Sequence, residues 1–139
     1  MPLDPKRTVA DLKELRELTE DENGAQRVAW TDTWERAREW LRGLVAETGA
    51  KESIDAAGNQ WFTLAGKDKR AVLIGGHIDS VPNGGWLDGA LNVVAGVEVL
   101  RRVATRANRP SRYASSTGPT RKAHASGGVC SGRAPRPAR

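Results

Sequence analysis

A short apolar run that leads straight into a glycine-rich loop constrains the fold of this chain more than any other feature. Ala71–Ile74 is continuously apolar, which is typical of a strand buried on both faces. The loop GGHIDSVPNGGWLDG follows it, and from Gly89 to about Thr105 apolar residues recur at helical spacing. A strand, a loop and a helix in this order predict an α/β domain that places ligands at the carboxyl end of the strand.

The residues before this unit predict two helices and two further strands. A capping box at Thr8 and Asp11 would open the first helix, and the second would run from about Asp32 to Thr48. The expected strands are 51–54 and 60–65, and four tryptophans near the helices are expected to pack in the core: Trp30, Trp34, Trp40 and Trp61. Residues 1–105 therefore read as the N-terminal portion of an α/β domain.

Charge divides the chain into two parts with different properties. All 17 acidic residues lie at or before Glu98, whereas 8 of the 22 Lys and Arg residues follow Thr105. Residues 106–139 are rich in Arg, Ser, Ala, Gly and Pro, so we expect a disordered basic tail. Such a tail could bind nucleic acid nonspecifically, but Tyr113 is its only aromatic residue and it carries no recognition motif. We therefore expect no nucleic-acid partner.

Features that would indicate a secreted or membrane protein are missing from the sequence. Cys130 is the only cysteine, so no disulfide can form within one chain. The N-terminal residues have no apolar signal region, and no apolar run approaches the length that spans a bilayer. We expect a cytoplasmic protein that does not contact membranes.

The glycine-rich loop carries the residues that suggest chemistry. Imidazole and carboxylate are natural zinc ligands, and His77, Asp79 and Asp88 occur within twelve positions. Asp79 could fix the tautomer of His77, and Asp88 could fold back to the same centre through the Gly84–Gly85 turn. The alternative is purely structural: a satisfied histidine, a turn aspartate, and Asp88 as the N-cap of the next helix. The other histidine, His124, lies in the tail outside any motif.

The string GGHIDSVPNGGWLDGALNVVAGVEVL resembles a family of zinc-dependent amidohydrolases. It includes N-carbamoyl-L-amino acid hydrolase, allantoate amidohydrolase and bacterial β-ureidopropionase, within the aminoacylase and carboxypeptidase type of co-catalytic metallohydrolases. Residues 23–31 resemble the family's early substrate-side segment, and Asp55–Asn59 resembles its D-x-x-G-N turn. The resemblance covers roughly residues 8–104.

This resemblance implies roles for particular residues. His77 matches a ligand of one zinc ion, Asp88 the carboxylate that bridges two, and Asp79 the catalytic acid that orients His77. Asn83–Gly85 matches the loop that shapes the site. The implied reaction is hydrolysis of a linear amide or ureido C–N bond, most simply of an N-carbamoyl-L-amino acid, with Zn²⁺ as cofactor and Mn²⁺ or Co²⁺ possible. The family forms homodimers through an inserted domain that has no counterpart here.

The sequence departs from the family after the third predicted helix. The family needs a Glu-Glu pair that supplies a general base and a metal ligand, but no glutamate follows Glu98. Permissible codons can be assumed for residues 110–132 and read in a shifted frame that starts at the third base of the Pro110 codon. This frame can encode VTLRLVDWADEEGARFGRSLFG, which resembles the family's next strand and its DEEG motif. We hypothesise a frameshift between about Thr105 and Pro110 and a truncated, inactive fragment prone to aggregation. Resequencing the DNA tests this: incompatible codons would reject it.

Overall fold

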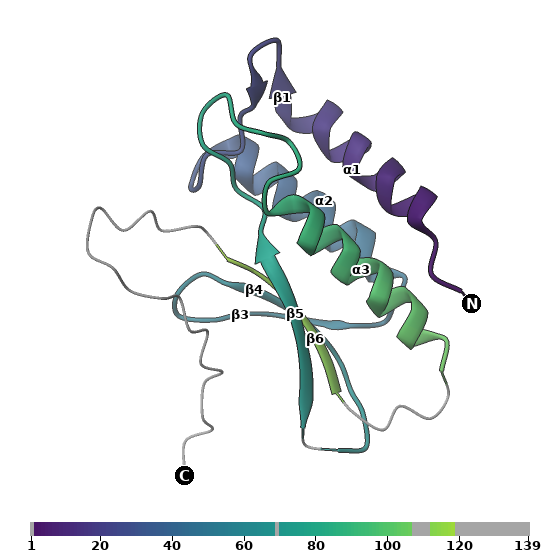
Figure 1. The fold of residues 1–139 in the computed structure, drawn as a ribbon. Helices are drawn as coiled ribbons and strands as arrows, with labels where there is room; N and C mark the ends of the chain where they lie inside the picture. The colour runs from purple at the N-terminus through teal and green to yellow at the C-terminus, as the bar shows by residue number, and fades with distance from the viewer. Residues whose placement is uncertain (1, 69, 107–111, 119–139) are drawn as a thin grey trace, which may run out of the picture.

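The computed structural model describes residues 2–68, 70–106 and 112–118, which form three helices on one side of a four-stranded sheet (Figure 1). The helices are α1 (Pro5–Thr19), α2 (Asp32–Ala46) and α3 (Ala90–Ala104). The sheet contains β3 (Lys51–Ile54), β4 (Gln60–Leu64), β5 (Ala71–His77) and β6 (Arg112–Gly118), and a separate hairpin joins β1 (Glu20–Asp21) to β2 (Gly24–Ala25). The α/β class predicted from the sequence is confirmed. None of the helices in the described ranges is long and apolar enough to cross a bilayer.

The sheet order brings the end of β5 beside the start of α3. The strands lie in the order β3-β4-β6-β5, with β5 and β6 parallel and the other two pairs antiparallel. Helix α3 connects the parallel pair and contacts both of its strands. The loop between β5 and α3 therefore emerges at the carboxyl edge of the sheet, where α/β folds place ligands.

The core lies between the helices and the sheet. Alternate residues of β4 point into it, and the predicted apolar stripes of α2 and α3 supply the facing side chains. Helix α1 begins at Pro5 and is capped by Asp4, whose carboxylate accepts from the amides of Lys6 and Arg7, so the predicted capping box at Thr8 is wrong. The largest buried apolar side chains are Leu12, Leu15, Trp34, Leu41, Phe62, Leu64, Ile78 and Leu100.

The prediction that four tryptophans pack in the core is wrong for two of them, Trp30 and Trp61. Trp34 is only 1% exposed, whereas Trp30 is 63% exposed and packs against Trp34 in a tilted arrangement, with ring centroids 4.8 Å apart and ring planes at 58°. Trp30 adopts a positive φ of 71°, so the chain turns between residues 26–29 and helix α2. Trp40 is partly buried and packs against the core, whereas Trp61, also partly buried, lies on the face of β4 that points away from the core.

Ion pairs that are buried or partly buried link the three helices. Arg101 on α3 bonds Asp11 of α1 at 2.6 Å and also pairs with Glu47 after α2. Arg7 makes a two-point contact with Glu98 at 2.9 Å for both bonds. Because a charge left without its partner would be costly, these contacts define one arrangement of the helices.

Strand β6 corrects the prediction of disorder after residue 105. Residues 112–118 form a strand between β4 and β5, although their composition is small and polar. Strand β6 makes main-chain hydrogen bonds with β4 on one side and with β5 on the other. These bonds stabilise the strand although few of its side chains are apolar. Residues 107–111 and 119–139 of the predicted tail lie outside the described residues.

Candidate metal site

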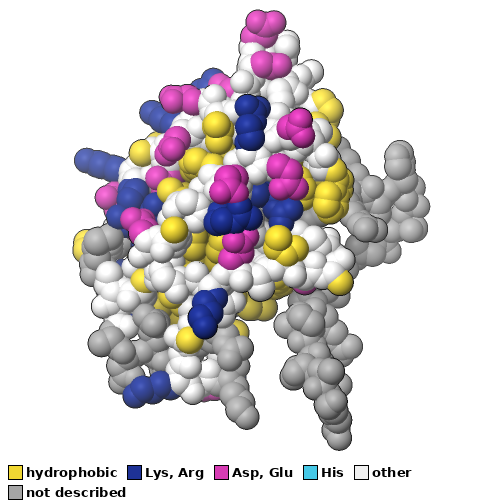
Figure 2. All heavy atoms as spheres, turned by 180° about the vertical axis from the view of Figure 1, so that it is seen from behind, with side chains coloured by type: hydrophobic (Ala, Val, Ile, Leu, Met, Phe, Trp, Pro, Cys, Tyr) yellow, Lys and Arg dark blue, Asp and Glu magenta, His cyan; other side chains and the backbone are white. Residues whose placement is uncertain are grey.

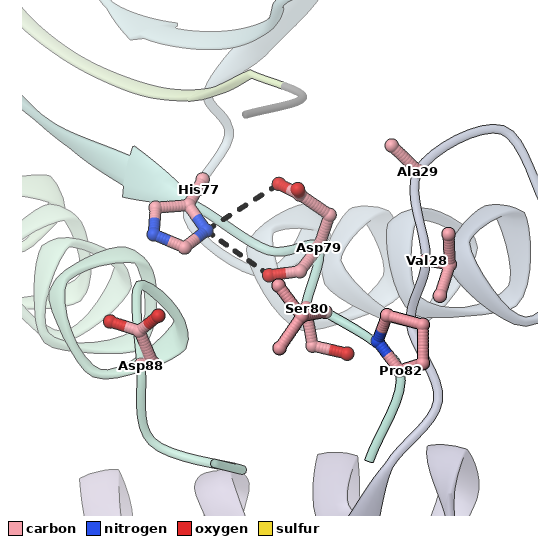
Figure 3. Close-up of a pocket in the computed structure, with 8 residues that line it drawn as sticks. Val28, Ala29, His77, Asp79, Ser80, Pro82 and Asp88 are labelled. Atoms are coloured by element: carbon pink, nitrogen blue, oxygen red, sulfur yellow. Dashed lines mark hydrogen bonds and ion pairs between the residues drawn. The ribbon is translucent and has the colours of Figure 1, made fainter. Parts of the chain in front are cut away.

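His77 ends strand β5, so its imidazole stands at the carboxyl edge of the sheet. Its Nδ1 lies 3.1 Å from the backbone oxygen of Asp79 and 3.5 Å from the Asp79 carboxylate (Figure 3). A carbonyl oxygen can only accept, so this hydrogen bond requires a proton on Nδ1. In the neutral ring, Nε2 then carries the lone pair and is available to a ligand.

Asp79 is held in place by its burial. Its side chain is 7% exposed, whereas that of His77 is 30% exposed. The backbone that follows is pinned because the amide of Ser80 donates to the carbonyl of Arg27 at 2.8 Å. This arrangement matches the predicted role of Asp79 as the residue that orients His77, although the role itself remains a prediction.

Asp88 approaches the His77 ring from another direction than Asp79. In Figure 3 its carboxylate points toward the imidazole from below, whereas Asp79 lies to the right of the ring. Helix α3 has Gly89 as its N-cap with no side-chain capping bond, so the alternative in which Asp88 caps the helix is wrong. An exposed carboxylate that does not cap the helix beside it is available for another partner.

One cavity of about 370 Å³ contains all three predicted site residues. His77, Asp79, Ser80 and Asp88 supply its polar wall. Its apolar lining comes from two segments far apart in sequence: Val28, Ala29, Val81 and Pro82. A cavity with a few convergent polar groups beside an apolar wall suits a small organic molecule that has a polar part and an apolar part.

The residues fit a divalent cation in chemistry but not in number. Imidazole nitrogen and carboxylate oxygen are ligands that Zn²⁺, Mn²⁺ and Co²⁺ all accept. Within the described ranges, however, no three His, Cys, Asp or Glu side chains gather closely enough to hold a metal ion. A cation held by His77 and Asp88 would need further ligands from elsewhere.

Gly89 shows how tightly the site is built. It adopts a φ of +67°, which favours glycine. A Cβ at this position would lie 2.5 Å from both Nδ1 and Cε1 of His77. The approach of helix α3 to the imidazole therefore depends on the absence of a side chain.

The structure also adds residues that sequence reasoning missed. Val28 and Ala29 line the cavity, and the segment before them pairs with the loop through a two-way backbone contact between Ala25 and Gly84. Asn83, with a φ of +56°, accepts from the side-chain amide of Gln26 at 2.7 Å. The only sequence signal for this contact was the family likeness of residues 23–31, because no periodic pattern marks a loop–loop contact.

Charged side chains of both signs are mixed on the face of the molecule that Figure 2 displays. Among the described residues drawn there, Lys and Arg are interspersed with Asp and Glu. The basic tail that could bind nucleic acid falls outside the described residues, apart from residues 106 and 112–118.

Comparisons with known proteins cover the site and its scaffold. The model of Peptidase family M28 matches residues 59–114. N-carbamoyl-L-amino acid amidohydrolase of Geobacillus stearothermophilus is 40% identical over 93 residues, which is 65% of this chain and 23% of that protein. Ureidoglycolate hydrolase of Oryza sativa subsp. japonica is 30% identical over 88 residues, 62% of this chain and 18% of that protein.

The fold is similar to solved structures over a larger share of the chain. A hydantoinase/carbamoylase family amidase from Burkholderia ambifaria superposes with a TM-score of 0.78 at 29% identity, covering 83% of this chain and 29% of that chain. This chain spans about a quarter of the length of the relatives that it matches.

Proposed function

We propose that this chain forms part of a site that hydrolyses a linear ureido or amide C–N bond. The support is its relationship, predicted from the sequence, to the co-catalytic metallohydrolases that include the N-carbamoyl-L-amino acid amidohydrolases. N-carbamoyl-L-amino acids are the proposed substrate class, since two of the relatives are named for cleaving carbamoyl or ureido compounds. The observation that carries the proposal is the convergence of His77 and Asp88 on one cavity, with Asp79 behind the imidazole.

In this proposal each residue has a defined task. Asp79 keeps the proton of His77 on Nδ1, so that Nε2 can hold a divalent cation together with the carboxylate of Asp88. A cation bound there would supply the positive charge that polarises a substrate carbonyl and makes water more acidic. The apolar wall formed by Val28, Val81 and Pro82 would receive the carbon skeleton of the substrate and exclude water from it.

The described residues do not account for the whole reaction. Hydrolysis needs a general base within hydrogen-bonding reach of the attacking water. The three side chains in the cavity that could act as a base, His77, Asp79 and Asp88, are already assigned to holding or orienting the cation, and the sequence has no glutamate after Glu98. We therefore expect the 139-residue chain to bind a cation without turning over substrate.

Cation titration of the purified chain tests the ligand set. We expect calorimetry with Zn²⁺, and visible absorption with Co²⁺, to detect one site that depends on both ligands. His77→Ala and Asp88→Ala should each weaken binding at least tenfold, because each removes one of two protein ligands. His124→Ala is the matched control, as it removes the only other histidine and should leave the affinity unchanged.

A chimera tests the reaction itself. Residues 1–105 would replace the matching segment of the Geobacillus stearothermophilus enzyme, which supplies the remaining chain. We expect release of ammonia from an N-carbamoyl-L-amino acid, and loss of this activity with His77→Ala. A folded chimera that binds the cation but cleaves no carbamoyl or ureido compound would contradict the proposed function.

A further inference from the structure

The segment that leads into helix α2 is docked on the loop that carries the candidate ligands. The carbonyl of Arg27 accepts from the amide of Ser80 at 2.8 Å, and the amide of Arg27 donates to the Ser80 hydroxyl at 3.0 Å. Ala25 and Gly84 exchange backbone hydrogen bonds of 3.0 and 3.2 Å. Two segments separated by more than fifty residues are thus joined by three backbone hydrogen bonds and one bond to a serine hydroxyl.

The side chain of Arg27 reaches beyond this set and lies fully buried, at 0% exposure. Its Nε donates to the carbonyl of Ile78 at 2.7 Å, and one terminal nitrogen donates to the carbonyl of Trp86 at 3.2 Å. The other terminal nitrogen donates to the hydroxyl of Thr19, at the end of α1, at 3.1 Å. One guanidinium therefore ties the helix layer to both ends of segment 78–86.

The position of these two carbonyls explains why this contact matters. Ile78 follows His77 directly, and Trp86 precedes Asp88 by two residues. The intervening segment contains two consecutive glycines and is largely exposed, so on its own it would allow many separations of its ends. A rigid planar fork bonded to both ends removes that freedom.

Burying the guanidinium has a cost that packing alone does not explain. Its three hydrogen-bond acceptors are two carbonyls and a hydroxyl rather than carboxylates. Burial lowers the pKa of Arg27, and the negative charges of Asp79 and Glu20 oppose that effect. A charge kept in such a place is better explained by the geometry that it imposes than by its own contribution to stability.

We propose that Arg27 is a positioning residue that sets the separation between His77 and Asp88 by holding both ends of segment 78–86. This inference rests on the proposed function in one respect, that the two side chains act as ligands of one cation. The holding of the loop does not depend on the presence of a cation, so it can be measured separately.

Two variants of Arg27 and one control test this. Arg27→Met keeps most of the apolar stem and removes the fork, whereas Arg27→Lys keeps the charge but replaces the rigid planar fork by a single ammonium group on a flexible stem. Arg36→Met, on the exposed face of α2, is the control. We expect amide hydrogen exchange at Ser80 and Gly84 to speed up at least tenfold in both Arg27 variants, with exchange in the core of α3 unchanged. The ring ¹⁵N shifts of His77 should move as well.

The affinity of the Arg27 variants for Zn²⁺ tests whether the position of the loop affects cation binding. We expect both Arg27 variants to bind Zn²⁺ 10- to 100-fold more weakly, the range typical when a supporting residue behind a ligand is lost. The inference would be overturned if Arg27→Lys kept the wild-type amide exchange rates at Ser80 and Gly84 and the wild-type ring shifts of His77. It would also be overturned if the Arg27 variants exchanged faster but bound Zn²⁺ with unchanged affinity. If the wild type binds no Zn²⁺, the proposed function fails, and the exchange and ring shifts still decide whether Arg27 positions the loop and His77.

Discussion

At the scale of single residues, the site depends on a close approach that only glycine permits. Gly89→Ala would force a Cβ into the His77 ring and strain a left-handed backbone, so we expect a loss of at least about 1–2 kcal/mol in the free energy of unfolding. Cation binding should weaken although both ligands remain. Gly43→Ala is the control, because nothing lies within 4 Å of its new Cβ and an exposed helix gains about 0.5–1 kcal/mol from alanine. Chemical denaturation and Zn²⁺ titration measure both effects, and a stable, tightly binding Gly89→Ala variant would contradict the geometry.

The residues that the sequence identified and those that it missed differ in what reveals them. His77, Asp79 and Asp88 lie in one contiguous motif, so the sequence alone predicts that they act together. Arg27 has no motif, because its importance comes from carbonyls that lie about fifty to sixty positions away. Backbone carbonyls are present at every position, so the sequence cannot indicate which of them will receive a buried arginine.

At the scale of elements, the best-predicted segments are those whose apolar pattern is continuous. Helix α2 and strand β5 begin at the residues expected, Asp32 and Ala71. Hairpin β1–β2 was missed because strands of two residues have no periodicity to read. Strand β6 was missed because a central strand is normally apolar, whereas Ser115 and Thr117 point polar side chains into its buried face.

That mismatch bears on the frameshift hypothesis. In the alternative reading VTLRLVD, leucines fall at the places of Tyr113 and Ser115, which share the helix-facing side of the strand with Thr117. Such a strand would carry the apolar pattern that its central position calls for. The resequencing test stated above remains the direct one.

The polar strand gives a stability prediction of its own. The buried Oγ1 of Thr117 has no hydrogen-bond partner among the described residues, although the side chain is only 3% exposed. Thr117→Val replaces the hydroxyl by a methyl group of similar size, and we expect the free energy of unfolding to rise by about 1 kcal/mol. Thr63→Val, on the opposite face of β4, should change it by less than about 0.5 kcal/mol. A destabilised Thr117→Val variant in urea titration would show that the hydroxyl is satisfied.

At the scale of the whole molecule, the described part of the chain is layered on one side only. All three helices lie on the same side of the sheet, and among the described residues nothing covers the other (Figure 1). The open face carries Leu73, which is 48% exposed, and the partly exposed ring of Trp61. Strand β5 is also an edge strand of the described sheet, so its outer backbone groups can pair with another chain.

An uncovered apolar face beside an open edge predicts self-association. We expect sedimentation velocity of the 139-residue chain to show concentration-dependent association at micromolar levels. Leu73→Lys should reduce it, because a charge on the open face opposes both stacking and edge pairing. Leu3→Lys makes the same change at a 55% exposed leucine before α1, away from the sheet, and should leave the association unchanged. A monomeric wild type at high concentration, with a single cooperative thermal transition, would show that the single helix layer stabilises this part of the fold without a partner for its open face.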